Sequence, residues 1–298
     1  MAPTAPHGPP AFPPLPARPP LTPPPPWQLG GLSWGFARPL LLGVLNATPD
    51  SFSDGGRYLD PGQAVAHAHA LVAEGADMID VGGASSHPKA PPVPEAEELR
   101  RVLPVLERLR RELGVPLSID TQRPAVAQAA VQAGAVLIND VSGLPDVAMA
   151  RVAAAHDVPL VITYNNLTLP PPIRAAAQPE AMLSFFRGRI AAAEAAGARR
   201  LVLDPGYGFG KPLAVSLAVL RAVPALCALG RPVLVCTSRK GSLGRITGEA
   251  DPAARVGATV ASSLVAVQGG AALVRVHDVA PMRQALQTWR AIATGQVD

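Results

Sequence analysis

The chain has only two cysteines among its 298 residues, Cys227 and Cys236, and their separation fits no metal-binding spacing. Such sparse cysteine predicts a reducing, cytoplasmic setting. No stretch approaches the roughly 20 consecutive apolar residues that a membrane-spanning helix requires. The N-terminus also lacks the basic start and apolar centre of a secretion signal. We therefore expect a cytoplasmic protein without a membrane partner.

Aromatic residues make up only 4% of the chain, and Lys and Arg are spread along it rather than clustered, with a formal net charge of +4. Nucleic-acid-binding proteins gather basic residues on one surface and stack bases on aromatic side chains. Anionic small molecules are therefore favoured over nucleic acid as partners. Hydrophobic residues reach 48%, which is ample for one large core or two small ones.

Proline is concentrated at the beginning of the chain. Residues 1–26 are rich in proline and end in Pro23-Pro24-Pro25-Pro26. Because proline has a fixed φ and no amide donor, this segment cannot join a sheet or continue a helix. We expect a disordered, partly polyproline-II extension, with a role as an SH3-type ligand as the alternative. Residues 27–298 are expected to form a single domain.

Beyond Pro39, short apolar runs alternate with longer stretches of helical spacing. In residues 95–113, apolar side chains recur every three or four positions and charged residues fill the other face. Pro104 lies inside this stretch and is expected to kink the helix or mark its first turn. The apolar runs are Leu40–Leu45, Met78–Val81, Leu117–Ile119, Val136–Ile138, Leu160–Ile162, Leu201–Leu203, Val233–Val235 and Leu273–Val276.

The apolar runs do not alternate with polar residues, as is typical of strands buried on both faces of a parallel sheet. Eight such runs, each followed by a helical stretch, predict an α/β fold, the (β/α)8 TIM barrel, whose usual length is ~250 residues. A doubly wound open sheet is the alternative. It is disfavoured because no G-x-G-x-x-G turn follows the first run.

Polar residues follow nearly every apolar run. In a (β/α)8 barrel the C-terminal ends of all strands face one mouth, where the active site lies. One polar residue there is readily explained as a loop cap, but a ring of them indicates a binding site. The ring residues are Asn46, Asp120, Asn139, Asp204, Lys240, Arg275 and His277.

The acceptors of this ring are Asp120, Asn139 and Asp204. They suit a flat heterocycle with N–H and NH2 edges, because a carboxylate accepts paired donors well. Asn46 offers a hard oxygen, which suits Mg2+ held mainly by substrate phosphates and water. The sequence therefore predicts a heterocyclic substrate and a magnesium ion at one mouth.

The other ring members, Lys240, Arg275 and His277, are cationic or become so on protonation. Cations suit a phosphate or a diphosphate. For Lys240 the alternative is a surface lysine at a helix end, because a glycine-rich stretch follows it at once. The glycine-rich turn that carries Phe209 and Lys211 lacks P-loop spacing. We interpret it as a tight mobile turn that lets both side chains approach a ligand.

A set of motifs occurs in order at the ends of these runs: GVLNATPDSFSDGGRY, SIDT, INDVSG, LDPGYGFGK, TSRKGSLG and RVHDV. Together they resemble the dihydropteroate synthase family over residues 39–293. The resemblance implies a (β/α)8 barrel, usually a homodimer, that acts in folate biosynthesis. It also implies a transferase reaction, in which (7,8-dihydropterin-6-yl)methyl diphosphate condenses with 4-aminobenzoate to give 7,8-dihydropteroate and diphosphate.

The same resemblance implies roles for the residues that would bind the pterin. Asp120, Asn139 and Asp204 would hold its polar edge. Lys240 would bind the pterin and act in catalysis, and Phe209 would contact substrate beside it.

The resemblance also implies how the rest of the substrates would be bound. Arg275 and His277 would hold the departing diphosphate as catalytic residues, and Asn46 would help bind Mg2+. Ser86 stands where the family has a threonine that contacts the diphosphate-bearing substrate, and Phe52 would lie near the aminobenzoate. The loops 47–60 and 84–92 would close over the site.

The chain departs from the family pattern in three places, one of which is Gly241, where the family commonly has a serine or another side chain after the lysine. The chain reads GGASSHPKA where the family usually reads GGESTRPGA, so His87 replaces an arginine and its charge depends on pH near about 6.5. The fifth run ends in Thr163-Tyr164-Asn165 instead of MHM or MHN, so the methionine that normally packs on the pterin is missing. Two alternatives remain: a pterin-binding paralogue without catalysis, and a pterin-dependent methyltransferase with a corrinoid partner.

Overall fold

The structure, a computed structural model, describes residues 26–29, 31–47, 61–85, 90–168 and 179–297. The proline-rich extension therefore lies outside the described residues, except for Pro26. The loop positions Phe52, Ser86 and His87, with the closing roles expected for their loops, also lie outside them.

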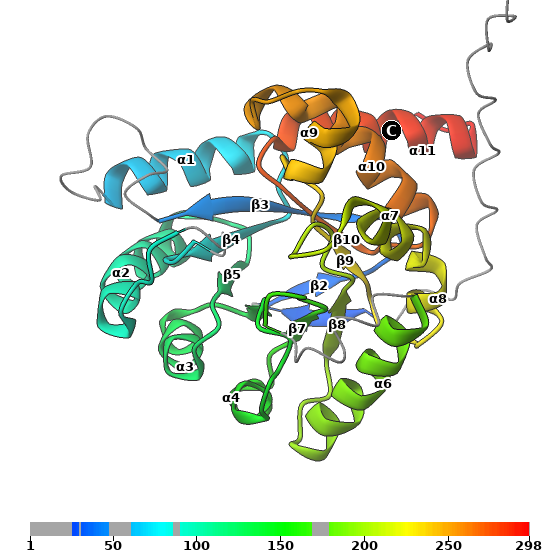
Figure 1. The fold of residues 1–298 in the computed structure, drawn as a ribbon. Helices are drawn as coiled ribbons and strands as arrows, with labels where there is room; N and C mark the ends of the chain where they lie inside the picture. The colour runs from blue at the N-terminus through cyan, green and yellow to red at the C-terminus, as the bar shows by residue number, and fades with distance from the viewer. Residues whose placement is uncertain (1–25, 30, 48–60, 86–89, 169–178, 298) are drawn as a thin grey trace, which may run out of the picture.

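Eight parallel strands form the central sheet, in the order β8-β7-β6-β5-β4-β3-β10-β9. A parallel bridge between Leu203 of β8 and Val233, just before β9, joins the two edges of this sheet. The sheet thus closes into the predicted barrel, and the open-sheet alternative is excluded (Figure 1). The strands are β3 (Leu40–Asn46), β4 (Met78–Gly82), β5 (Leu117–Asp120), β6 (Leu137–Asp140), β7 (Leu160–Thr163), β8 (Leu201–Asp204), β9 (Leu234–Val235) and β10 (Leu273–Val276).

Helices follow the strands and surround the barrel (Figure 1). Pro104 lies in the middle of α2, so the expectation that it marks the first turn is wrong. Within the described part of the chain, no helix combines the length and apolarity needed to cross a membrane. The helices are α1 (Pro61–Ala73), α2 (Glu95–Glu112), α3 (Pro124–Ala133), α4 (Ala148–Ala155), α6 (Pro179–Ala195), α7 (Leu213–Arg221), α8 (Val223–Cys227), α9 (Gly241–Thr247), α10 (Val256–Gln268) and α11 (Val279–Thr294), with a 3-10 turn at Ala253–Arg255.

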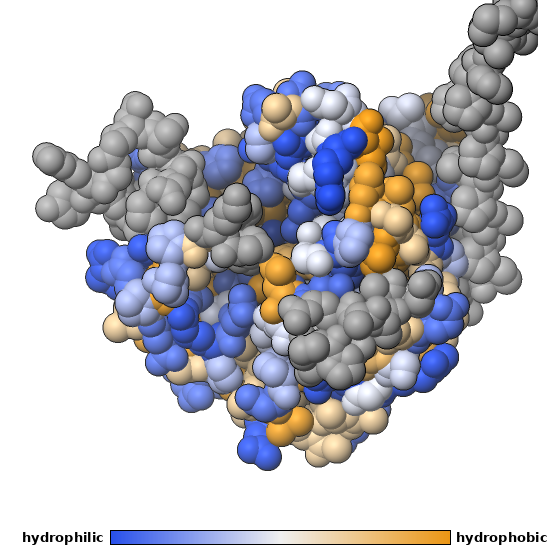
Figure 2. All heavy atoms as spheres, viewed as in Figure 1, coloured by the Kyte–Doolittle hydropathy of each residue, from blue (hydrophilic) through white to orange (hydrophobic). Residues whose placement is uncertain are grey.

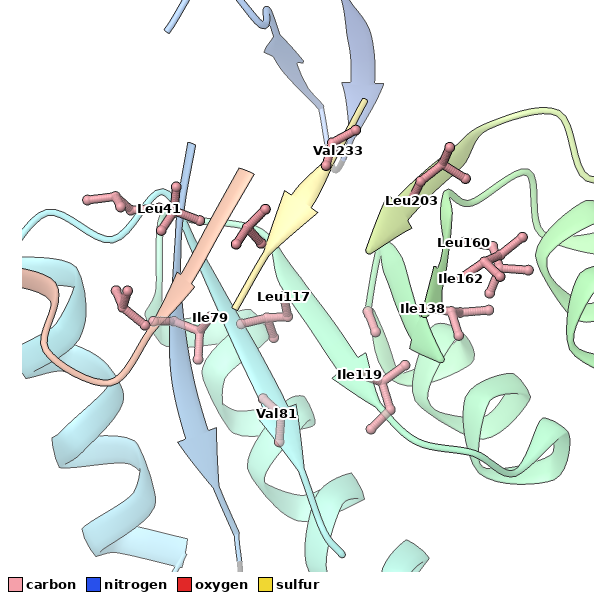
Figure 3. Close-up of a cluster of buried hydrophobic side chains, with 14 of the residues drawn as sticks. Leu41, Ile79, Val81, Leu117, Ile119, Ile138, Leu160, Ile162, Leu203 and Val233 are labelled. Atoms are coloured by element: carbon pink, nitrogen blue, oxygen red, sulfur yellow. The ribbon is translucent and has the colours of Figure 1, made fainter. Parts of the chain in front are cut away.

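The main hydrophobic core lies between the barrel and its helices. Side chains alternate along each strand, so every second residue faces outward. Ile79, Ile119 and Ile162 are among these outward residues, and all are fully buried (Figure 3). This layer fixes each strand against its helix and thereby sets the direction of the inward side chains.

A second apolar cluster fills the base of the barrel. Inward residues of the strands, among them Leu42, Met78 and Leu273, pack against Leu29 and Trp34. The latter two belong to the antiparallel hairpin of β1 (Trp27–Leu29) and β2 (Leu32–Trp34). This hairpin was not predicted from the sequence, although a Gly-Gly pair between two short apolar segments is a hairpin signal. With the base apolar, the polar residues are confined to the opposite end.

Candidate active site

The carboxyl ends of the strands bring the predicted ring residues to one mouth. In the parallel ladders, Asp120 lies opposite Asn139, and Gly82 lies between Asn46 and Asp120 on its two neighbouring strands. Asp204 lies opposite Thr163. The barrel geometry therefore turns residues that are far apart in sequence into neighbours, as the strand-end pattern predicted.

Asp80 is the centre of the polar network, although the sequence analysis did not single it out as a site residue. It is fully buried on β4. Arg275 donates from Nε to Oδ2 of Asp80 at 2.5 Å and from Nη2 to Oδ2 of Asp120 at 2.7 Å. Asn139 donates from Nδ2 to the same Asp80 oxygen at 3.0 Å, and the Ser118 hydroxyl donates to the other. Asp80 is an acidic residue inside an otherwise apolar run, and this feature of the sequence could have identified it as a site residue.

This network gives Arg275 two carboxylate partners inside the protein. Its guanidinium is thereby fixed across the barrel, between β4 and β5. A charge that is buried and paired in this way is a rigid electrostatic element rather than a mobile side chain. The contact to diphosphate that the family resemblance implied for Arg275 stays a prediction.

Two carboxyl groups at the mouth have raised pKa values. Burial raises the pKa of Asp120 to about 7, against the opposing charges of Arg275 and Lys240. Burial likewise raises the pKa of Asp204 to about 6, although the Gly206 backbone N–H donates to Asp204 Oδ1 at 2.7 Å. Burial therefore disfavours the charged form of both carboxyls, which favours ligands that bring hydrogen-bond donors to them.

Lys240 lies within the site. It precedes α9, and its Nζ lies 3.9 Å from the centre of the Phe209 ring, a cation–π contact. Its positive charge also opposes the rise that burial causes in the pKa values of Asp120 and Asp204. Lys240 therefore acts on both carboxyl groups. Lys240 thus stands at a helix start, as the alternative expected, but it is half-buried beside Phe209 rather than on the open surface.

Lys211 has a different task from the expected approach to a ligand. It is buried, and its Nζ donates to the carbonyl oxygens of Tyr164 and Gly206, the latter at 2.8 Å. Burial lowers the pKa of Lys211 to about 7. Gly206 has φ +63°, and a Cβ there would lie 2.2 Å from the Tyr164 oxygen. Lys211 thus ties the turn that carries Phe209 to the end of β7.

His277 is held by Ser238, which lies three residues beyond the end of β9. The Ser238 oxygen lies 2.9 Å from Nδ1 of His277 and accepts its backbone N–H at 3.1 Å. Burial, reinforced by the charge of Arg275, lowers the pKa of His277 to about 3. This environment favours the neutral imidazole, and the contact of His277 with an anion stays a prediction.

In the divergent segment Thr163-Tyr164-Asn165, neighbouring side chains lie on different sides of the barrel wall. Tyr164 is fully buried against Phe185 and Phe186 in the outer core. Asn165 donates from Nδ2 to the Val141 carbonyl at 2.7 Å. Thr163 alone of these three lies at an inward strand position.

Among the described residues, no group of three or more His, Cys, Asp or Glu side chains is arranged to hold a metal ion. The role expected for Asn46, holding Mg2+ together with substrate phosphates and water, stays a prediction.

A closed barrel with buried carboxyls, an amide and cations at its strand ends defines a (β/α)8 enzyme for a polar, anionic small molecule. The family model of the pterin binding enzymes matches residues 42–277. Dihydropteroate synthase of Bacillus subtilis is 44% identical over 249 residues, covering 80% of this chain and 84% of that protein. The chain belongs to the pterin-binding enzymes and, within them, to the dihydropteroate synthases. It is accordingly a transferase of folate biosynthesis.

Solved structures agree with this assignment. A dihydropteroate synthase of Xanthomonas albilineans with 4-aminobenzoic acid has a TM-score of 0.84 and 44% identity, and the match covers 91% of this chain and 98% of that one. The same enzyme in complex with 7,8-dihydropteroate has a TM-score of 0.81 at 44% identity, with 91% and 99% covered. The predicted barrel and the predicted family are thus both confirmed.

Proposed function

We propose that the protein joins (7,8-dihydropterin-6-yl)methyl diphosphate to 4-aminobenzoate through the residues at its strand ends. The single observation that carries this is the meeting of Asp120, Asn139 and Asp204 with Lys240 and Arg275 at one barrel mouth. The first three offer the acceptors that a pterin edge requires, and the last two offer positive charge. The relatives solved with 4-aminobenzoic acid and with 7,8-dihydropteroate support these substrates.

The acceptors hold the pterin ring in this proposal. Asp204 and Asp120 take ring N–H and NH2 groups, and Asn139 adds a carbonyl oxygen whose amide is oriented by Asp80. Burial raises the pKa values of both carboxyls and so disfavours their charged forms. The N–H and NH2 groups of the bound pterin stabilise these charged forms by hydrogen bonds. Lys240 lies over Phe209 and brings a cation to the same ring.

Departure of the diphosphate is an electrostatic problem. Cleavage of the carbon–oxygen bond leaves a pterin-methyl cation and a diphosphate anion, so groups already in place at the anion lower the barrier. Arg275 contributes a fixed charge, and neutral His277 contributes a hydrogen bond from its ring N–H. When bound, Mg2+ would neutralise diphosphate charge, and Asn46 is the residue that would help hold it. The amine of 4-aminobenzoate then needs orientation more than a base, and we assign no general base.

The decisive assay is formation of dihydropteroate from the two substrates with and without Mg2+. The proposal expects product only with both substrates and a rate that falls when Mg2+ is chelated. Absence of product at saturating substrate would contradict it. Calorimetry separates the alternatives: pterin binding without 4-aminobenzoate binding, even with diphosphate present, indicates a non-catalytic paralogue. Methyl transfer from a folate would indicate the methyltransferase.

We also propose a cytoplasmic homodimer. Both cysteines are free thiols, which supports a reducing compartment. An apolar strip on the side shown in Figure 2 lies where α7 and α10 run, and Val215, Val260 and Leu264 of these helices are only partly buried. Sedimentation of the protein tests the assembly, and a monomer at all concentrations would contradict it.

A further inference from the structure

Among the residues that the structure describes, none gives the buried hydroxyl of Thr163 a hydrogen bond. The residue ends β7 and is fully buried, yet its Oγ1 reaches no donor or acceptor among the described residues. Buried polar groups are nearly always paired, and an unpaired one lowers stability. An orphan hydroxyl at a strand end therefore points to a partner that arrives with a ligand.

The position of Thr163 places this hydroxyl in the barrel rather than among the helices. Val161 belongs to the apolar cluster at the barrel base, whereas Ile162 and Tyr164 belong to the outer core. Strand alternation then puts Thr163 on the inward face with Val161. In the ladder between β7 and β8, Thr163 lies opposite Asp204. Its hydroxyl thus borders the carboxyl to which we assign the donor edge of the pterin.

A second orphan atom lies on the neighbouring strand β6. The Oδ1 atom of Asn139 is buried and has no partner among the described residues, while its Nδ2 donates to Asp80. The amide is therefore oriented with its carbonyl unpaired. Two unpaired polar atoms on adjacent strands, both at inward positions, fit one polar ligand better than two separate defects.

We propose that Thr163 is a specificity-determining residue for the pterin, whose Oγ1 hydrogen-bonds to a polar ring atom next to the edge bound by Asp204. This rests on the proposed function, because it takes the pterin as the ligand of this mouth. A dihydropterin has a carbonyl oxygen and a ring nitrogen beside its N–H and NH2 groups, and a hydroxyl can serve either kind of atom. An apolar side chain at this position would contact the ring by dispersion alone.

The test replaces Thr163 by valine, which keeps the shape and removes the hydroxyl. Titration with 6-hydroxymethyl-7,8-dihydropterin is expected to show roughly fivefold weaker binding, the size of one neutral hydrogen bond. The KM for 4-aminobenzoate should stay unchanged. Thermal stability should rise or hold, because an unpaired buried hydroxyl has been removed. Thr163→Ser retains the hydroxyl and should restore pterin affinity.

Ser216→Ala is the matched control. Ser216 also has a fully buried hydroxyl without a partner among the described residues, but it lies on α7, outside the barrel. Its loss should affect stability as Thr163→Val does and leave pterin binding unchanged. Wild-type affinity in Thr163→Val would overturn the inference.

Turnover is measured separately in the wild-type protein. If the protein binds pterin in a manner that depends on Thr163 but forms no dihydropteroate, the proposed reaction fails and the inference stands. If it forms dihydropteroate and Thr163→Val binds pterin normally, only the inference fails. A wild-type protein that binds no pterin would overturn both.

Discussion

The Ser238 hydroxyl oxygen accepts the backbone N–H of His277 at 3.1 Å and lies 2.9 Å from Nδ1 of the same residue. The hydroxyl can donate to Nδ1 while its oxygen accepts the backbone N–H, and we assign this arrangement, with the ring proton on Nε2. Ser238 thereby fixes which nitrogen of His277 can donate to an anion. In the proposed reaction, Ser238 would therefore act as a positioning residue for the departing diphosphate.

Ser238→Ala should release this tautomer and lower kcat/KM for the pterin diphosphate by up to about tenfold, the value of one hydrogen bond. The KM for 4-aminobenzoate should not change. Nitrogen-15 NMR of the His277 ring reports the tautomer directly and would not respond to a merely structural role of Ser238. A wild-type spectrum with the proton on Nδ1 would contradict the assignment.

Arg275→Met should leave Asp80 as a buried carboxylate without its cationic partner, since Asp80 is fully buried and Arg275 is the cation that contacts it. We expect a loss of about 3–5 kcal/mol in the free energy of unfolding, measured with urea. Adding Asp80→Asn should recover part of it, because the orphaned charge is gone. Arg108→Met is the control: it removes an exposed pair with Glu112 and should cost at most about 0.5 kcal/mol. A loss near the control value would show that the pair does not stabilise the fold.

Asp204→Asn should change how stability depends on pH. The folded-state pKa of Asp204 is raised to about 6 from an unfolded value of about 3.9, so its stabilising proton is lost as pH rises through this window. Asparagine does not titrate and can still accept the Gly206 N–H. The variant's advantage over wild type should therefore grow from about pH 4 to pH 6 and then level off, at an order of magnitude of about 2–3 kcal/mol. Urea unfolding at several pH values measures it, and a difference independent of pH would contradict the raised pKa.

Lys240→Ala should weaken pterin binding by about 1.5–3 kcal/mol, because a charged donor is removed from the ring. Arg245→Ala, on the exposed side of the helix that follows Lys240, is the control for a general loss of positive charge. Calorimetric titration with the pterin compares the two. Equal affinities in Lys240→Ala and wild type would remove Lys240 from the pterin site.

Much of the barrel was predictable because its strands are buried on both faces. Each apolar run, such as Leu273–Val276, lies in or beside an observed strand, and four of the eight strands end on the polar residue that directly follows the run, as at Asp120 and Asp204. Strand ends in a parallel barrel share one mouth, so the ring followed from topology alone. The hairpin of β1 and β2 was not predicted, because its strands of three residues are too short to show an alternation of apolar and polar residues.

The partners of the site residues were not predictable from strand positions. That Arg275 pairs with Asp80 depends on which side chains meet across the barrel, and sequence does not give this. The neutral state of His277 depends on burial and on the charge of Arg275, which are properties of the folded protein. Lys211 showed the same limit, because a lysine in a glycine-rich turn gives no sign that backbone carbonyls will hold it.

The hairpin that carries Leu29 and Trp34 has a kinetic consequence. It packs the barrel base with apolar side chains, so the polar strand ends lie at the opposite end of the barrel. If both substrates enter from that end, the one bound against Asp80 and Arg275 is expected to arrive first. The product is then expected to leave through the same mouth by which the substrates enter. The order of binding and release is in this way set by the fold as well as by the chemistry of the site.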